Sequence, residues 1–317
     1  MSTITTQAPA SVQRTQQSQG RAYAALALGI LCIGFSAIFT KWAGVPGPVS
    51  GFYRVAIATL VLALPAAAGA RQVFRLGGPT LALALLAGCF FAGDLSLWNT
   101  SLLYTSAANS TLLGNTSTLW VSLWALLVLH EVLGRRFWVG TALALIGAAL
   151  IVGPDMRGGV TDAWGDVLAL GSSLFYAAYL LSTGRVRRTA GTVEFMWLSS
   201  FGAALVLLVF NVATGLPLWG FTFDQYAALV ALGLISHVAG WLCINYALGH
   251  LRASLTSVSL LAQPVITAVA SVPLLGEALS VAQVAGGALV LGGIYLANRR
   301  PASEASAEPT GSGEPAT

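Results

Sequence analysis

The chain has 317 residues, of which 56% are hydrophobic and only 8% carry a charged side chain. Soluble domains have about 25% charged residues, so this chain has too few to cover a surface that faces water. The formal net charge of +4 is small and forms no basic, aromatic-rich face, which argues against nucleic acid as a partner. Apolar runs of about 20 residues recur along the chain, the length that crosses a hydrocarbon core of ~30 Å, so an all-α integral membrane protein is predicted.

The two ends of the chain are polar. Residues 1–20 are rich in Ser, Thr and Gln, with Arg14 as their single charge, and residues 300–317 are rich in Pro, Ser, Gly and Glu. Such segments cannot bury enough apolar surface to fold, so both are predicted to be disordered tails. The first apolar run, Ala22 to Thr40, is too long for the apolar part of a signal peptide and is not followed by a small-residue cleavage site. It is therefore predicted to be a retained span.

Between these tails, hydropathy predicts ten membrane spans joined by short connections. Lys and Arg in short loops gather on the cytoplasmic side of a membrane protein. With the N-terminus inside, twelve arginines lie at the inner side and Arg157 alone lies at the outer side, so both termini are predicted to be cytoplasmic. The predicted spans are Ala22–Trp42, Pro48–Ala68, Thr80–Tyr104, Ala107–Leu129, Phe137–Val152, Gly165–Thr183, Thr192–Ala213, Gln225–Gly249, Ala253–Leu275 and Val281–Asn298.

The chain contains an internal repeat. Identical residues recur in the two halves at one constant separation in residue number, without insertions or deletions. We call this separation the repeat offset. Such self-similarity indicates duplicated structural units. Here it divides the chain into residues 21–153, with spans 1–5, and residues 164–299, with spans 6–10. The matched pairs are Asn99 and Asn245, Ala107 and Ala253, Glu131 and Glu277, Gly140 and Gly286, and Gly147 and Gly293.

The number of spans in each half decides how the two halves are related. Because five is odd, the second half enters the membrane from the side opposite to the first. Glu131 is then expected in an inner loop and Glu277 in an outer one, both in structural roles. The prediction is ten transmembrane helices arranged as two inverted five-helix repeats, an architecture of secondary transporters that bind substrate near the midplane at the repeat interface.

The second half carries small and polar residues at a recognisable spacing, namely Pro264, Gly276–Glu277, Gln283–Gly286 and Gly293. This string resembles the signature of the drug/metabolite transporter superfamily, EamA-like branch. The first half repeats it with Glu131, Gly140 and Gly147. One departure is Thr118, which stands where the second half has Pro264, so the fourth span is expected to be straighter than the ninth.

The resemblance covers nearly all of residues 20–300. It implies a ten-helix bundle in the inner (plasma) membrane, with a central cavity lined by spans 1, 3, 4, 6, 8 and 9. It also implies export or exchange of small metabolites, including amino acids.

Polar side chains within about a turn of each span's midpoint are candidate site residues, because a charge at mid-bilayer costs roughly 2.5–3.5 kcal/mol on insertion scales. The fifth and tenth spans carry none and are expected to be packing elements, supported by the small residues of the tenth, which favour close helix contact. The candidates are Arg54, Asp94, Asn115, Tyr176, His237 and Gln263.

Two aromatic residues join this set. Asp94 and Trp98 are four residues apart and share a face of the third span, and His237 and Trp241 do the same on the eighth. Together they are predicted to receive the amine and the apolar body of a zwitterion. Structural roles remain open as alternatives. In these roles, Asp94 is a structural partner of Arg54, His237 is a core residue with its hydrogen bonds satisfied, and Asn115 and Gln263 form bridges between helices.

The predicted function is a secondary transporter that moves amino acids or related amphipathic metabolites by alternating access. The alternative is a channel or a non-transporting receptor or scaffold. Asp94 and His237 are candidate carriers of a coupled proton. The expected partners are a small-molecule substrate and the lipid bilayer, with the chain as a monomer or homodimer.

An enzyme is not predicted. His130 and His250 lie at span ends away from His237, and the sequence holds no nucleophile motif or paired carboxylates. The three cysteines lie inside apolar spans and are interpreted as small core residues. Because there is no metal-ligand cluster or nucleotide-binding motif, no metal, cofactor or ATP drive is expected.

Overall fold

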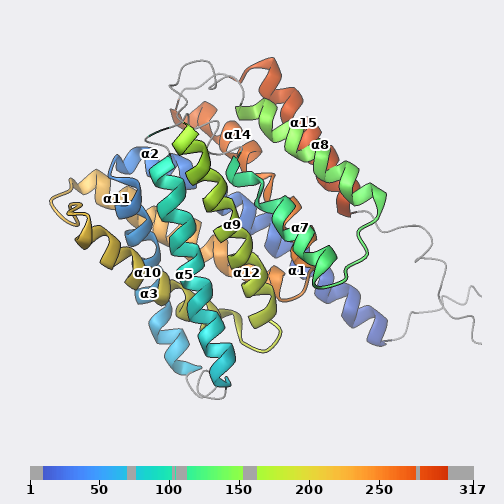
Figure 1. The fold of residues 1–317 in the computed structure, drawn as a ribbon, viewed down its shortest axis with the longest axis horizontal. Helices are drawn as coiled ribbons and strands as arrows, with labels where there is room; N and C mark the ends of the chain where they lie inside the picture. Colours follow the sequence, from blue (N-terminus) through green and yellow to red (C-terminus); the bar gives the residue numbers. More distant parts are fainter. Residues whose placement is uncertain are drawn as a thin grey trace, which may run out of the picture.

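A computed structural model describes residues 10–69, 76–101, 104, 113–152, 163–275 and 279–298. The elements it forms in these ranges are helices (Figure 1). In chain order they are α1 (Ala10–Gly34), α2 (Ser36–Ala43), α3 (Gly47–Ala68), α5 (Gly78–Ser101), α7 (Ser117–Leu127), α8 (Arg135–Val152), α9 (Ala163–Val186), α10 (Thr192–Ala213), α11 (Phe223–Ala231), the π-helix η2 (Leu232–Ala239), α12 (Gly240–Leu248), α13 (Ala253–Leu260), α14 (Gln263–Leu275) and α15 (Val281–Asn298).

The helices confirm a multi-pass membrane protein. Within the described residues, 8 candidate spans are long and apolar enough to cross a membrane. Three of these combine consecutive elements, namely α1 with α2, α11 with η2 and α12, and α13 with α14. The described parts of the fourth and fifth predicted spans, α7 with 11 residues and α8 with 18, are not among the eight.

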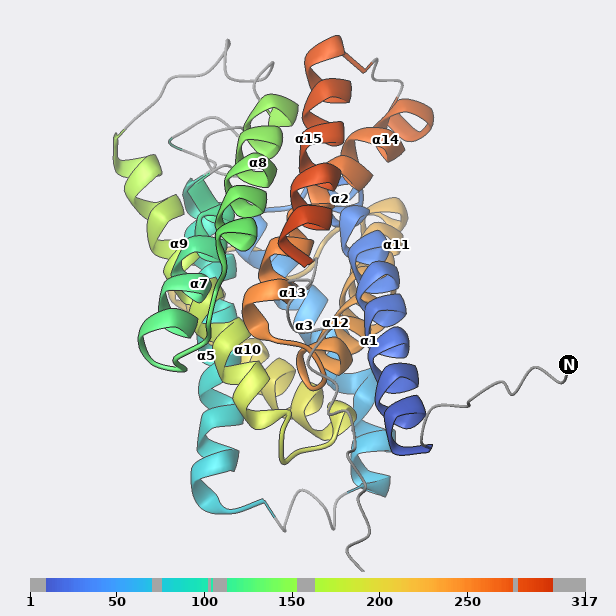
Figure 2. The same cartoon turned by 90° about the vertical axis from the view of Figure 1, so that its right-hand side faces the viewer.

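The repeat is visible in the helix boundaries. Helices α8 and α15 begin and end at residues related by the repeat offset, and they lie side by side in both views of the fold (Figures 1 and 2). Their contact is reciprocal, because a Cβ atom on Gly140 would meet the Gly293 carbonyl oxygen at 2.5 Å, and one on Gly293 would meet the Gly140 oxygen at 2.5 Å. Small residues thus let the two backbones touch, as predicted for the tenth span.

The offset between the repeats is not the same throughout. Helix α10 begins and ends one residue earlier than the repeat offset from α3 would place it, and the buried pair Leu62 and Leu207 has the same shorter separation. The buried pair Asn99 and Asn245, and the starts of α7 and α14, show the full repeat offset. The eighth span therefore holds one residue more than the third. The π-helix η2 absorbs it, because a π-turn accommodates one residue more than an α-turn.

Four predicted spans are interrupted where continuous helices were expected. The first breaks at Phe35 and the ninth at residues 261–262, and the eighth contains η2. The breaks of the first and ninth spans lie next to each other, since the Thr267 hydroxyl donates to the Gly34 carbonyl oxygen at 2.7 Å. The fourth span breaks at Thr116.

The fourth span, which was expected to be straighter than the ninth, is interrupted at the equivalent position. The amide of Thr116 donates to the Leu113 oxygen at 3.1 Å, and the amide of Ala262, the equivalent residue of the second repeat, donates to the Ser259 oxygen at 3.1 Å. The fourth span has no proline at this position, and the Thr116 side chain stabilises the break instead. The Thr116 hydroxyl also bonds the Leu113 oxygen, at 2.5 Å, which offers the backbone an alternative to the helical ladder.

The N-terminal segment also differs from its prediction. Helix α1 begins at Ala10, inside the tail that was expected to be disordered. The reason is that residues 11–19 contain neither Pro nor Gly and include several Gln, which has good helix propensity, so the helix of the first span continues through them. Residues 1–9 and 299–317 lie outside the described residues.

Polar side chains fix the start of α15 and the loop before α8. Ser280 and Gln283 form a capping box at the start of α15, because the Gln283 amide donates to the Ser280 hydroxyl at 3.2 Å and the Ser280 amide donates to the Gln283 side chain at 2.9 Å. Glu131 accepts a hydrogen bond of 2.7 Å from the Ser254 hydroxyl and so ties the loop before α8 to the start of α13. Glu277 lies outside the described residues.

Candidate functional site

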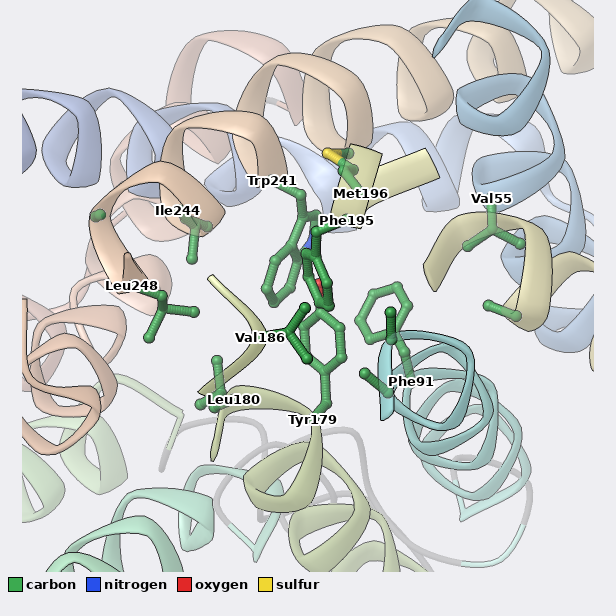
Figure 3. Close-up of a cluster of buried hydrophobic side chains, with 14 of the residues drawn as sticks. Val55, Phe91, Tyr179, Leu180, Val186, Phe195, Met196, Trp241, Ile244 and Leu248 are labelled. Atoms are coloured by element: carbon green, nitrogen blue, oxygen red, sulfur yellow. The ribbon is translucent and has the colours of Figure 1, made fainter. Parts of the chain in front are cut away.

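Phe91 on α5 lies at the centre of a buried aromatic cluster. Its ring centroid is 4.8 Å from that of Tyr179 on α9, 5.1 Å from that of Trp241 on α12 and 5.5 Å from that of His237 on η2. Figure 3 shows the side chains of Phe91, Tyr179 and Trp241 converging from three helices. Because α5 belongs to the first repeat and the other three elements to the second, this cluster lies at the repeat interface.

Arg54 on α3 brings a positive charge to the cluster. Its guanidinium carbon lies 5.8 Å from the centre of the Phe91 ring, a cation–π distance. Its Nε–H donates to His237 Nδ1 at 3.3 Å, and its terminal nitrogen donates to the Ser36 hydroxyl at 3.2 Å. Ser36 is the first residue of α2, so the break in the first span supplies one partner of this arginine.

His237 is only 3% exposed and bonds through both ring nitrogens. Its Nδ1 faces Arg54, and its Nε2 lies 3.2 Å from the Ser200 hydroxyl of α10. The π-helix η2 sets the direction of this ring. Such segments occur frequently at functional sites.

Asp94 lies three residues after Phe91 on α5 and brings a negative charge. Its carboxylate accepts a hydrogen bond of 2.7 Å from the Ser172 hydroxyl of α9. Among the described residues, no ion pair joins Asp94 to Arg54, and each of the two forms hydrogen bonds to neutral side chains. Both charged side chains keep part of their surface accessible. The arrangement is therefore not a closed ion pair that locks the bundle.

Two buried donors at predicted site residues have no hydrogen-bond partner in the described part of the chain. They are Nε1 of Trp241, whose side chain is 3% exposed, and Nδ2 of Asn115 in the fourth span. Buried polar atoms are nearly always paired with protein or water, so an unpaired donor needs an explanation. A ligand with acceptor atoms would satisfy such donors.

The remaining predicted residues divide between this centre and its surroundings. Tyr176 lies in the centre, with its ring 6.1 Å from that of Trp241. Gln263 donates to the Ile33 carbonyl oxygen at 3.4 Å and so bridges the broken first and ninth spans. Trp98 packs against Gly114, next to Asn115 in the fourth span. The structure thus brings together Arg54, Asp94, Tyr176, His237 and Trp241.

Sequence reasoning missed four residues of this centre: Phe91, Ser36, Ser172 and Ser200. A signal for Phe91 was available, because it precedes His237 by the repeat offset. The three serines gave no such signal. A serine in a membrane span is common, and only the packed structure shows which hydroxyls face a charged group.

Within the described residues, no three His, Cys, Asp or Glu side chains come together as a metal site requires. Cys32, Cys89 and Cys243 are free cysteines. The centre comprises one cation, one anion, aromatic surfaces and two donors that have no hydrogen-bond partner among the described residues.

Known proteins resemble this chain along most of its length. A solved crystal structure superimposes with a TM-score of 0.75, covering 87% of this chain and 96% of its own at 21% identity, which shows a shared fold. An uncharacterized transporter of Bacillus subtilis, YdfC, is 24% identical over 190 residues, 60% of this chain and 61% of its own length. An uncharacterized transporter of Archaeoglobus fulgidus is 28% identical over 207 residues, 62% of this chain and 70% of its own length.

The chain thus spans less than two thirds of YdfC's length. The match to a family is broader and covers both repeats. The family model described as the EamA-like transporter family matches residues 20–153 and again residues 163–299. These two matches fall on the two halves that the internal repeat defines. The chain belongs to the EamA-like transporter family.

Proposed function

We propose that this protein is a secondary transporter that exports or exchanges small zwitterionic metabolites, with amino acids as the first class to test. It works by alternating access through a central cavity at the repeat interface. Arg54 binds the substrate carboxylate, Asp94 binds the ammonium group, and the aromatic rings hold the apolar body. The proposed location is the inner (plasma) membrane, with both termini in the cytoplasm.

The observation that carries this proposal is the pair of opposite charges next to Phe91 that form no ion pair within the described residues. Charges inside a membrane are costly and are usually paired with one another. Arg54 and Asp94 are instead held apart by separate hydroxyl partners, Ser36 and Ser172. A zwitterion carries both complementary charges on one small molecule and would form ion pairs with Arg54 and Asp94 at the same time.

The aromatic residues support the rest of the assignment. Trp241 has a free indole donor in the described part of the chain, and Tyr176, Tyr179 and Phe91 lie around it. Aromatic faces suit apolar side chains, and a nearby donor suits a second carboxylate oxygen. The partial accessibility of Arg54 and Asp94 fits side chains that border a substrate cavity.

The interrupted spans support alternating access. Transporters built from inverted repeats use discontinuous helices near the midplane, where freed backbone groups and helix ends can contact substrate. Here the breaks at Phe35 and Thr116, the π-helix η2 and the break at residues 261–262 all occur within spans. Adding α7 and α8 as the fourth and fifth spans gives the ten spans of the proposed topology. Helix α8 matches α15 in length and offset.

The proposal is tested by counterflow in proteoliposomes that contain the full chain. Vesicles are loaded with an unlabelled amino-acid panel, and entry of labelled aromatic and small neutral amino acids is followed. We expect saturable counterflow that Asp94→Asn abolishes. Asp224→Asn makes the same chemical change at an exposed position outside the centre and is the matched control.

Either of two results would contradict the proposal. Flux that does not saturate and shows no counterflow would indicate a channel. Equal loss of counterflow in Asp94→Asn and Asp224→Asn, with both proteins monodisperse, would remove Asp94 from the substrate site.

A further inference from the structure

The tautomer of His237 can be derived from its two partners. A guanidinium has N–H groups and no acceptor, so the Arg54 Nε–H can only donate to His237 Nδ1 across the 3.3 Å between them. Nδ1 must then carry a lone pair. In a neutral imidazole with an acceptor at Nδ1, the proton is on Nε2. The contact of 3.2 Å between Nε2 and the Ser200 oxygen is therefore an N–H donating to a hydroxyl.

Protonation of His237 would disrupt this arrangement. A second ring proton would place an N–H at Nδ1 opposite the N–H of Arg54, so that two cations would face each other with no acceptor between them. The other groups near Arg54 do not relieve this conflict. Asp94 on α5 accepts from Ser172 of α9, and Tyr176 and Tyr179 on α9 are neutral phenols that pack on Trp241. Ser36 on α2 accepts from Arg54, and α10 contributes Ser200.

The π-helix η2 carries His237 and places its ring at the contact with Arg54. The eighth span holds one residue more than the third, and the extra residue falls in η2, which includes His237. The ring centroid lies 5.5 Å from that of Phe91, its repeat partner in the equivalent span, with the two ring planes tilted by 32°. It therefore stands between the two repeats, with Arg54 of the first on one side and Ser200 of the second on the other.

We propose that His237 is a positioning residue: as a neutral Nε2–H tautomer it orients the Arg54 guanidinium toward the substrate carboxylate, and it does not carry the coupled proton. The role in orienting substrate rests on the proposed function. The tautomer rests on the Arg54–His237–Ser200 geometry alone. Of the two candidate proton carriers, this leaves Asp94, whose carboxylate has one neutral partner.

The tautomer is tested without any substrate by 15N NMR of the full chain in lipid, labelled at histidine. The chain has 3 histidines, so the double variant His130→Asn, His250→Gln leaves His237 as the single signal. We expect one neutral Nε2–H species from about pH 5 to pH 8, the range in which an unperturbed histidine titrates. Titration within that range, or an Nδ1–H species, would overturn the proposal.

Two further variants test the two hydrogen-bond partners of the His237 ring, Arg54 and Ser200, one at a time by the same NMR measurement. Arg54→Met removes the donor to Nδ1, so we expect both tautomers or a titrating ring. Ser200→Ala removes the acceptor at Nε2 but keeps Arg54, so we expect the Nε2–H species to persist. An unchanged spectrum in Arg54→Met would show that Arg54 does not fix the tautomer and would refute the proposal.

The positioning role is tested by counterflow with an amino acid and with its carboxamide, which lacks the carboxylate. His237→Leu leaves Arg54 without its acceptor, and we expect the KM of the amino acid to rise roughly tenfold, in line with a hydrogen bond to a charged group. The KM of the carboxamide should change much less. His237→Asn can place an oxygen near the position of Nδ1, so we expect it to restore most of the affinity.

The pH dependence of counterflow is measured for the same variants. We expect His237→Asn to keep the pH dependence of the wild type, because the titrating group is elsewhere. Loss of an ionisation in this variant, or an equal rise in KM for both substrates in His237→Leu, would overturn the role. Absence of counterflow with any amino acid would sink the proposed function while the NMR result on the tautomer stands by itself.

Discussion

The contact between α8 and α15 predicts a sharp difference between two glycines. A Cβ atom on Gly140 would lie 2.5 Å from the Gly293 oxygen, 2.6 Å from the Ala297 nitrogen and 2.9 Å from the Ala297 Cβ. The first two are backbone atoms and cannot rotate away. A Cβ on Gly292, which is also in α15, would meet nothing within 4 Å. The same Gly→Ala change therefore has opposite effects at the two positions.

The size of the effect follows from these distances. Ordinary van der Waals contact for a Cβ begins at 3.4 Å, so Gly140→Ala must separate the two backbones by about 1 Å. A gap of that size forfeits roughly a quarter to a half of each contact energy along the seam. Overpacking of this kind costs about 1–3 kcal/mol. Gly292→Ala has no such cost and gains up to about 1 kcal/mol, because alanine has the better helix propensity.

The assay is thermal or denaturant unfolding of the purified protein in one detergent, followed by tryptophan fluorescence. We expect Gly140→Ala to unfold earlier than wild type and Gly292→Ala to unfold at the same point or later. The reasoning would be refuted if both variants were equally stable. Gly147→Ala, which meets the Gly286 oxygen at 2.5 Å, should repeat the effect. The double variant should lose less than the sum, because both substitutions need the same separation.

Three further predictions concern hydrogen bonds at charged groups. Arg54→Lys cannot donate in two fixed directions, so the KM for a zwitterion should rise at least about tenfold in counterflow while the carboxamide is affected less; an equal effect on both would contradict it. Ser172→Ala removes the 2.7 Å donor to Asp94 and should lower the free energy of unfolding by about 1–3 kcal/mol, which denaturant titration measures. Ser254→Ala removes the 2.7 Å donor to Glu131 at a half-buried site and should cost about 1 kcal/mol in the same assay; no loss would show that this contact is not stabilising.

The spans were predictable because the bilayer imposes a length on them. A helix that crosses ~30 Å of hydrocarbon shows in the sequence as an apolar run, and a duplicated run shows as an offset. The interruptions inside the spans were harder to predict. Pro264 accompanies the break of the ninth span, but neither Phe35 nor Thr116 is a helix breaker. Their breaks are stabilised by tertiary and side-chain hydrogen bonds, such as the one from Thr267 to the Gly34 oxygen, which no local pattern encodes.

The candidate site was predictable in part for the same reason. A charged or imidazole side chain at mid-span stands out against apolar neighbours, which is why Arg54, Asp94 and His237 could be selected. Their mutual contacts depend on which faces the helices turn to one another, and the π-helix changes that face for His237. Trp98 shows the limit of spacing arguments. It lies one turn from Asp94 on α5, yet it packs against Gly114.

The single extra residue in η2 has a consequence for the energy of the proposed transport cycle. If two inverted repeats were identical, exchanging their conformations would turn the outward-open state into an inward-open state of equal free energy. Here the third span has no extra residue with which to form a bulge, and it carries Phe91 where the eighth carries His237. In the proposed alternating-access cycle this exchange would therefore not be degenerate, and the unloaded protein would favour one of the two states.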